Sequence, residues 1–311
     1  SEMCIRDSNR NVPFHRSAFA NFAALTKTFV TMKRIISISL LAVSAMLGSA
    51  QTNINVFTPE DLQPGKPCDT LRYVITYDMA YVEDTLQVPM KAAHETMLLE
   101  TGRKVTAFYS YDAFRSDSVN AELLSRGATQ YSVLGRIPWR LYANYPETGR
   151  SSFTEKLGLD RFVCVESVEK PQWQLCPDSS ATILGYPCRL ATACYKGRLW
   201  SAWYAEDIPL YYGPWKLCGL PGLILRAYDS QRHYVFEAIG IKTADEPRPI
   251  YYKGEGYEKV NRKDLNGLYR RYYSDPVGYM TAGGKVTVKM QDRSGKSVAP
   301  PKGVPYNPIE R

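Results

Sequence analysis

The residues of this sequence that could carry out chemistry are few and far apart. After residue 50 the only histidines are His94 and His233, and neither has a cluster of cysteines or carboxylates nearby in sequence. A histidine-based zinc site needs such a cluster, so no metal is expected. The sequence also has no G-x-S-x-G, no H-E-x-x-H, no phosphate-binding glycine loop and no dinucleotide fingerprint. We therefore expect no bound cofactor and assign no catalytic residue.

One pair of residues supports an enzymatic hypothesis. Cys188 and His233 fall on neighbouring predicted hairpins, and a thiol next to an imidazole is the arrangement of a thiol-dependent hydrolase or transferase. The simpler interpretation is a buried thiol at the start of a strand and an exposed histidine beside a turn. The adjacent carboxylates Glu206 and Asp207 would point to opposite faces of an extended chain, which indicates a solvated strand end rather than an acid–base pair.

The cysteines suggest one cross-strand disulfide. Six follow residue 50, none in a C-x-x-C motif: Cys68, Cys164, Cys176, Cys188, Cys194 and Cys218. If residues 162–168 and 172–176 form a hairpin centred near Lys170, Cys164 and Cys176 lie opposite each other, within the reach of a disulfide. The alternative is two free thiols that pack as small hydrophobic side chains.

Residues 206–222 form a long connection that is too apolar for a solvated loop. Loops of this length are often lids or binding loops. The alternative is a plug that completes the core, which we favour because apolar loop residues more often finish a core than bind a ligand. If a ligand binds here, the expected binding residues are the aromatic side chains of this connection and of the preceding strand: Trp200, Trp203, Tyr204, Tyr211, Tyr212 and Trp215.

The elements that would position these side chains are mostly antiparallel strands. The predicted hairpins join residues 97–100 with 105–109, 162–168 with 172–176, 188–195 with 198–205, and 223–228 with 233–241. The two-residue loop Lys196-Gly197 sets the clearest register, with Trp200 opposite Ala193 and Trp203 opposite Leu190. Further strands are expected at 71–78, 134–142 and 285–289, and helices at 118–126 and 261–273, the second capped by Asn261.

The stretch 219–225 combines a turn with the start of a strand. In Leu220-Pro221-Gly222-Leu223, the proline and glycine predict a type II turn, and Gly219, Pro221 and Gly222 are assigned a structural role in it. Together with the absence of βαβ alternation, these patterns predict a mainly β fold. We expect an antiparallel, curved or incompletely closed sheet or barrel with one or two packed helices.

The N-terminal part has the composition of a processed leader. Met32-Lys33-Arg34, the apolar run 35–47 and the small residues Gly48-Ser49-Ala50 are typical of a signal peptide over 32–50, and residues 1–31 are interpreted as artefactual upstream translation. The expected mature chain, 51–311, is a single β-rich domain with an extended N-terminal arm and a proline-rich C-terminal tail. Gln51 after the small residues gives no reason to expect a lipid anchor, so a periplasmic or secreted location is predicted.

Charge and hydropathy give no reason to expect nucleic-acid binding or a transmembrane segment. Residues 1–50 contain 6 of the 39 basic and 2 of the 31 acidic residues, so the rest of the chain has 33 minus 29, a net charge of +4. That small value, without a basic run interleaved with aromatic residues, gives no reason to expect nucleic-acid binding. After residue 50 no stretch is apolar enough for a transmembrane segment.

The chain resembles the GLPGLI family of exported Bacteroidetes proteins. The resemblance rests on Gly219-Leu220-Pro221-Gly222-Leu223-Ile224, on 183–188, on 197–204, on Ile208-Pro209 and Gly213-Pro214, and on the ending Tyr306-Asn307-Pro308-Ile309-Glu310. It implies export, and it implies no activity, because the family is uncharacterised. We expect a non-enzymatic envelope protein that binds a hydrophobic or peptide ligand, or an outer-membrane partner. The alternatives are the Cys188–His233 enzyme and a purely structural module.

Overall fold

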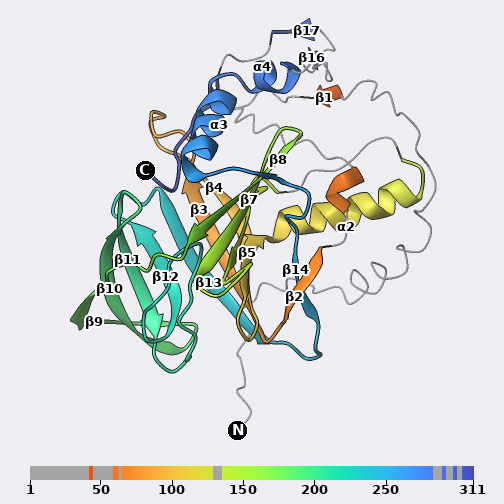
Figure 1. The fold of residues 1–311 in the computed structure, drawn as a ribbon. Helices are drawn as coiled ribbons and strands as arrows, with labels where there is room; N and C mark the ends of the chain where they lie inside the picture. The colour runs from red at the N-terminus through yellow and green to blue at the C-terminus, as the bar shows by residue number, and fades with distance from the viewer. Residues whose placement is uncertain are drawn as a thin grey trace.

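The computed structural model of the chain describes residues 42–44, 59–62, 65–128, 135–282, 289–291, 297–299 and 303–311 (Figure 1). Of the predicted signal peptide, only Ala42–Ser44 is described, as strand β1. Most of the predicted strand 285–289 lies outside the described residues. Within the described part of the chain, no helix has both the length and the apolar character needed to cross a bilayer.

Twelve strands form one large sheet with the order β15-β8-β7-β6-β5-β4-β3-β13-β12-β11-β10-β9. The sheet is not closed into a barrel, and every neighbouring pair in it is antiparallel except β15 and β8. Its strands are β3 (Tyr73–Val82), β4 (Ala92–Thr101), β5 (Thr106–Ser110), β6 (Arg140–Ala143), β7 (Arg150–Leu157), β8 (Asp160–Ser167), β9 (Gln174–Ile183), β10 (Tyr186–Tyr195), β11 (Arg198–Ala205), β12 (Leu223–Asp229), β13 (Tyr234–Thr243) and β15 (Glu258–Lys259).

The predicted fold class is therefore confirmed: the protein is mainly β, with an open, antiparallel-dominated sheet and packed helices. Strands β9–β12 turn away from strands β3–β8, so the sheet is strongly bent (Figure 1). Two smaller sheets pair β14 (Pro249–Tyr252) with β2 (Lys66–Thr70), and β16 (Lys289–Gln291) with β1 and β17 (Ser297–Val298). Part of the predicted extended arm is thus a short 3-10 helix, η2 (Pro59–Leu62), and the strand β2.

The hairpin of β10 and β11 forms in the predicted register. Trp200 lies opposite Ala193 and Trp203 opposite Leu190. Lys196 and Gly197 both have positive φ, +50° and +76°, as the favoured two-residue loop requires. The hairpins β4–β5 and β12–β13 also form as predicted.

The predicted hairpin around Lys170 does not form. Strand β8 pairs with β7, where Cys164 lies opposite Phe153, whereas β9 pairs with β10, where Cys176 lies opposite Leu190. The two strands are consecutive in the chain, but nine other strands lie between them in the sheet order. The predicted disulfide between Cys164 and Cys176 is therefore wrong, and each of the six cysteines after residue 50 is a free thiol.

The helices are capped by polar residues at their N-termini. Helix α2 (Tyr111–Ser125) begins earlier than predicted because the hydroxyl of Ser110 accepts a hydrogen bond from the Ala113 N–H. Helix α3 (Arg262–Ser274) is capped by Asn261, as predicted. A further short helix, α4 (Pro276–Thr281), has Asp275 as its N-cap and Pro276 at its first position, where a proline is favourable.

Both faces of the sheet are covered around β3 and β4. On β3, Ile75, Tyr77 and Met79 belong to the main core, whereas Val74 belongs to a second cluster that packs under α2 and β14. This division follows from the two-residue period of a strand. The main core also contains Trp200 of β11 and residues of α3 and of the connection 206–222, so that connection is part of the interior.

Candidate functional site

The connection 206–222, called here the crossover, packs against the sheet for most of its length. Ile208, Leu217 and Leu220 are buried. The crossover is also tied to β12, because the Leu223 N–H donates to the Ile208 carbonyl at 3.1 Å and the Ile224 N–H to the Tyr212 carbonyl at 3.0 Å. This part of the crossover is a plug, as favoured from the sequence.

The turn that ends the crossover differs from the type II prediction. The Gly222 N–H donates to the Leu220 carbonyl at 2.8 Å, which closes a three-residue γ-turn centred on Pro221. Gly222 has φ +159°, far from the value near +80° that a type II turn requires. A Cβ on Gly222 would lie only 2.1 Å from the Ala205 carbonyl oxygen, so close approach of two backbones explains this glycine. Gly219, with φ +90°, does occupy the left-handed region.

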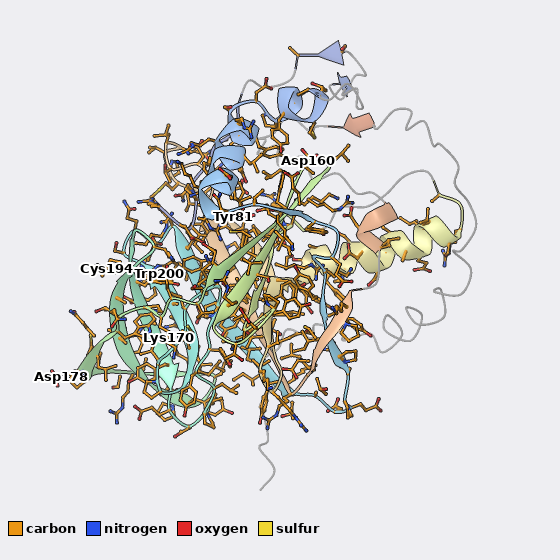
Figure 2. All side chains as sticks on the ribbon, in the orientation of Figure 1. Tyr81, Asp160, Lys170, Asp178, Cys194 and Trp200 are labelled. Atoms are coloured by element: carbon orange, nitrogen blue, oxygen red, sulfur yellow. The ribbon has the colours of Figure 1, made fainter. Side chains whose placement is uncertain are left out.

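A pocket of about 260 Å³ lies between the crossover and the ends of β6–β8 and β10, and we call it the crossover pocket. Its aromatic walls are Tyr195, Tyr211, Tyr212 and Trp215. Lys170 also lines it, and Figure 2 shows Lys170 and Trp200 in the same portion of the molecule, over strands β10–β12. The pocket combines aromatic faces with a few polar groups, as small-ligand sites do.

Trp215 is the most buried of the aromatic residues that line this pocket. It has φ +54° and is only 4% exposed, and its ring lies 5.6 Å from that of Trp200. Its indole Nε1 is buried and has no hydrogen-bond partner among the described residues. A buried N–H without an acceptor costs about 1–3 kcal/mol, so this group stands out in an otherwise packed segment.

The charged groups of the pocket wall pair with one another. Glu166 accepts hydrogen bonds from Arg262 of α3 and, at 3.0 Å, from Lys216 of the crossover. Burial alone would raise the pKa of Glu166, but these bonds and charges outweigh it and lower that pKa to about 2. Lys196 likewise pairs with Glu169 at 2.5 Å. Lys170 is the exception: it lines the pocket, is exposed to solvent and forms no ion pair among the described residues.

The structure divides the six predicted binding residues. Tyr211, Tyr212 and Trp215 line the crossover pocket, and Tyr211 is 59% exposed at its rim. Trp200 and Tyr204 are fully buried and do not line the pocket, although the ring of Trp200 packs against that of Trp215. Trp203 is half-buried on the other face of β11 and does not line this pocket.

The Cys188–His233 pair is not formed. Cys188 lies beside the Arg189–Tyr204 pair of the hairpin, whereas His233 follows Asp229, which lies opposite Trp200. Tyr204 and Trp200 are four residues apart along β11, about 13 Å, so Cys188 and His233 lie near different points of that strand. Burial also raises the pKa of the Cys188 thiol, which opposes formation of a nucleophilic thiolate. Among the described residues, no group of three or more histidine, cysteine or carboxylate side chains could hold a metal ion.

Sequence reasoning missed the residue that anchors the C-terminal segment. Residues 303–311, called here the tail, were expected to be a proline-rich extension, yet they lie across the sheet. The buried guanidinium of Arg198 donates to the carbonyls of Pro308 and Ile309, at 2.6 and 2.9 Å, and pairs with Asp229 at 2.7 Å. Asn307 adds a hydrogen bond from its side-chain amide to the Val82 carbonyl at 2.7 Å. Residues 197–204 and the motif in the tail both belong to the family resemblance described above. Nothing in the sequence, however, indicated that these two segments contact each other.

Comparisons with known proteins give one distant structural similarity. The sequence matches no protein-family model and no curated protein. Two crystal structures of PNGF-II, in space groups P21 and C2, are each similar to part of the chain, with a TM-score of 0.44 and 15% sequence identity. The alignment covers 66% of this chain and 34% of the PNGF-II chain. At this TM-score and identity, the similarity carries no inference about ligand or reaction.

Proposed function

We propose that this protein is a non-enzymatic binding module of the bacterial cell envelope that takes a peptide with an apolar side chain in the crossover pocket. The observation that carries the proposal is the buried, unpartnered indole N–H of Trp215 in the wall of an aromatic pocket. The signal peptide predicted over 32–50 and the resemblance to the GLPGLI family support the location in the envelope.

The size and charge of the pocket favour a neutral ligand. A cavity of about 150 Å³ is large enough to bind benzene, so a pocket of about 260 Å³ can accept an aromatic side chain together with its backbone carbonyl. Four of the charged wall residues form ion pairs, and the fifth, Lys170, is exposed to solvent, so no buried unpaired charge selects an ionic ligand. A peptide carbonyl would supply the acceptor that the Trp215 N–H lacks if the indole, whose Nε1 is covered in the empty pocket, turns toward the bound peptide.

The proposal is tested with two probes that differ in their acceptors. N-acetylphenylalaninamide carries two carbonyl groups, and ethylbenzene carries none. Titrations followed by the indole N–H signals in ¹H–¹⁵N NMR spectra should shift the Trp215 signal with the first probe. Trp215→Phe keeps an aromatic ring without the donor, and we expect it to weaken the amide roughly tenfold while leaving ethylbenzene binding nearly unchanged.

Trp203→Phe is the matched control, because Trp203 lies outside the pocket. It should alter the affinity for neither probe. The proposal is wrong if the amide fails to bind the unmodified protein, or if Trp215→Phe weakens both probes equally.

A further inference from the structure

The tail contacts the wall of the crossover pocket through one carboxylate. Oε1 of Glu310 lies 2.7 Å from Nζ of Lys216, and the same ammonium group lies 3.0 Å from Oε2 of Glu166. Lys216 and Glu166 line the crossover pocket, whereas Glu310 does not. The ammonium group of Lys216 therefore joins the wall of the pocket to the tail.

Arg262 of α3 completes a cluster of two cations and two carboxylates, called here the charge quartet: Glu166, Lys216, Arg262 and Glu310. The guanidinium of Arg262 binds Glu166 through two nitrogens, and its third nitrogen lies 3.7 Å from Glu310. The four side chains are between 9% and 21% exposed. Ion pairs so little exposed are screened less than surface pairs, so the quartet ties β8, the crossover, α3 and the tail to one another.

A second contact joins the tail to another part of the pocket wall. The backbone N–H of Arg311 donates to the Lys196 carbonyl at 3.0 Å. The two segments touch here, since a Cβ on Gly197 would lie 2.6 Å from the Cβ of Arg311. Lys196 and its neighbour Tyr195 line the pocket, and the Tyr195 ring lies 5.8 Å from that of Trp215. The tail thus contacts both the crossover, which carries Trp215, and the β10–β11 hairpin that packs against it.

Trp215 has a backbone conformation that its surroundings must hold in place. Its φ of +54° lies in the left-handed region, which a bulky residue occupies only where neighbouring contacts fix it. Lys216 is the next residue, and two carboxylates hold its ammonium group. A movement of the Trp215 backbone therefore displaces Lys216 against its ion pairs, one of which the tail supplies.

From these contacts we propose that the tail is a strap that keeps the crossover pocket closed, and that Glu310 is the group through which it acts. The inference rests on the function proposed above, in which the Trp215 indole turns toward a bound peptide. With the tail docked, the indole N–H is covered. Release of Glu310 leaves Lys216 with one partner fewer, so Trp215 turns at a smaller cost. Because coupling between two sites is reciprocal, a ligand in the pocket in turn loosens the tail.

The first measurement uses the ligand-free full chain. Exchange of the Trp215 indole proton with solvent is followed by NMR in the unmodified protein and in Glu310→Gln, which removes the charge and keeps the size of the side chain. We expect at least threefold faster exchange in the variant, because the covered N–H opens to water more often. Glu255→Gln is the matched control and should leave the exchange unchanged. Glu255 also pairs with a lysine, at 3.5 Å, but it lies outside the tail and does not line the pocket.

The second measurement is the affinity for N-acetylphenylalaninamide, determined by isothermal titration calorimetry. Glu310→Gln should bind the amide at least threefold more tightly than the unmodified protein does. Arg198→Met releases the tail through hydrogen bonds that lie outside the pocket, so it should also tighten binding. In the unmodified protein, a saturating amount of the amide should speed hydrogen exchange of the amides of residues 303–311.

Two results would overturn the strap. One is a Trp215 indole proton that exchanges no faster in Glu310→Gln than in Glu255→Gln. The other is an amide that binds the unmodified protein, Glu310→Gln and Arg198→Met with equal affinity. A failure of the proposed function is distinguishable from both, because the amide then binds none of the three proteins, whereas faster indole exchange in Glu310→Gln still supports the strap.

Discussion

Replacing Arg198 by methionine is the sharpest test of how the tail is held. Arg198 and Asp229 have side chains only 1% and 2% exposed, and the variant leaves the Asp229 carboxylate buried without its counter-charge. Removing one partner of a buried ion pair costs about 3–5 kcal/mol. For a domain of this size, about 2–4 °C of melting temperature is lost per kcal/mol, so Arg198→Met should lower the midpoint by about 6–20 °C.

The assay is thermal unfolding followed by circular dichroism, with hydrogen exchange across the tail as a second measurement. Arg198→Met should also speed exchange of the amides of residues 303–311, because Arg198 donates to two carbonyls of the tail. The matched control is Arg126→Met. Its ion pair with Glu122 has side chains 72% and 62% exposed, and exposed pairs contribute about 0–1 kcal/mol.

A third variant separates lost charge from lost packing. In Arg198→Met/Asp229→Leu neither side chain is charged, so much of the lost stability should return, since apolar replacement of a buried pair is often nearly neutral. The reasoning is refuted if Arg198→Met lowers the melting temperature no more than Arg126→Met does, or if exchange in the tail is unchanged.

Three further predictions concern the backbone, the thiols and a buried carboxyl. Gly222→Ala places a methyl group 2.1 Å from a backbone carbonyl and should greatly reduce the yield of folded protein, whereas Gly240→Ala, with open space around its Cβ position, should fold normally in the same expression assay. Iodoacetamide should alkylate the exposed Cys194 in the folded protein, and mass spectrometry should find the buried Cys188 unmodified until denaturant is added. Glu155 has a folded-state pKa of about 7, above its ordinary value of 4.5, so its contribution to stability is complete below pH 4.5 and is lost as the pH rises through 7. Denaturant titrations should therefore show that Glu155→Gln removes up to about 3 kcal/mol of the decline in stability over that range; an unchanged decline would contradict a raised pKa.

The sequence was most informative where structure is decided locally. The Lys196-Gly197 loop fixed the register of β10 with β11, and Asn261 marked the start of α3, because turn conformation and helix capping depend on a few neighbouring residues. The same local reasoning could have divided the predicted binding residues further. Trp200 and Trp203 are an odd number of positions apart on one strand, so they face opposite sides of the sheet.

The candidate site was only partly predictable. Tyr211, Tyr212 and Trp215 were identified from the apolar character of the crossover, and they do line one pocket. A cavity of about 130 Å³ lined by β3, β7, β13, α3 and the tail was not anticipated, because these segments are distant in sequence. The burial of Glu155 could not be predicted, because a glutamate in a strand is expected to face solvent unless the element that covers it is known.

The sequence by itself determined the mainly β class, most of the hairpins and the cap of α3, since these follow from side-chain periodicity and from the backbone preferences of glycine, proline and asparagine. Only the tertiary structure decided that Cys164 and Cys176 lie on strands that do not pair, and that the tail returns to Arg198. The physical reason is that distant segments compete for the same partners. The winning arrangement is the one that buries the most apolar surface and satisfies the most buried polar groups over the whole chain, and no short stretch of sequence contains that comparison.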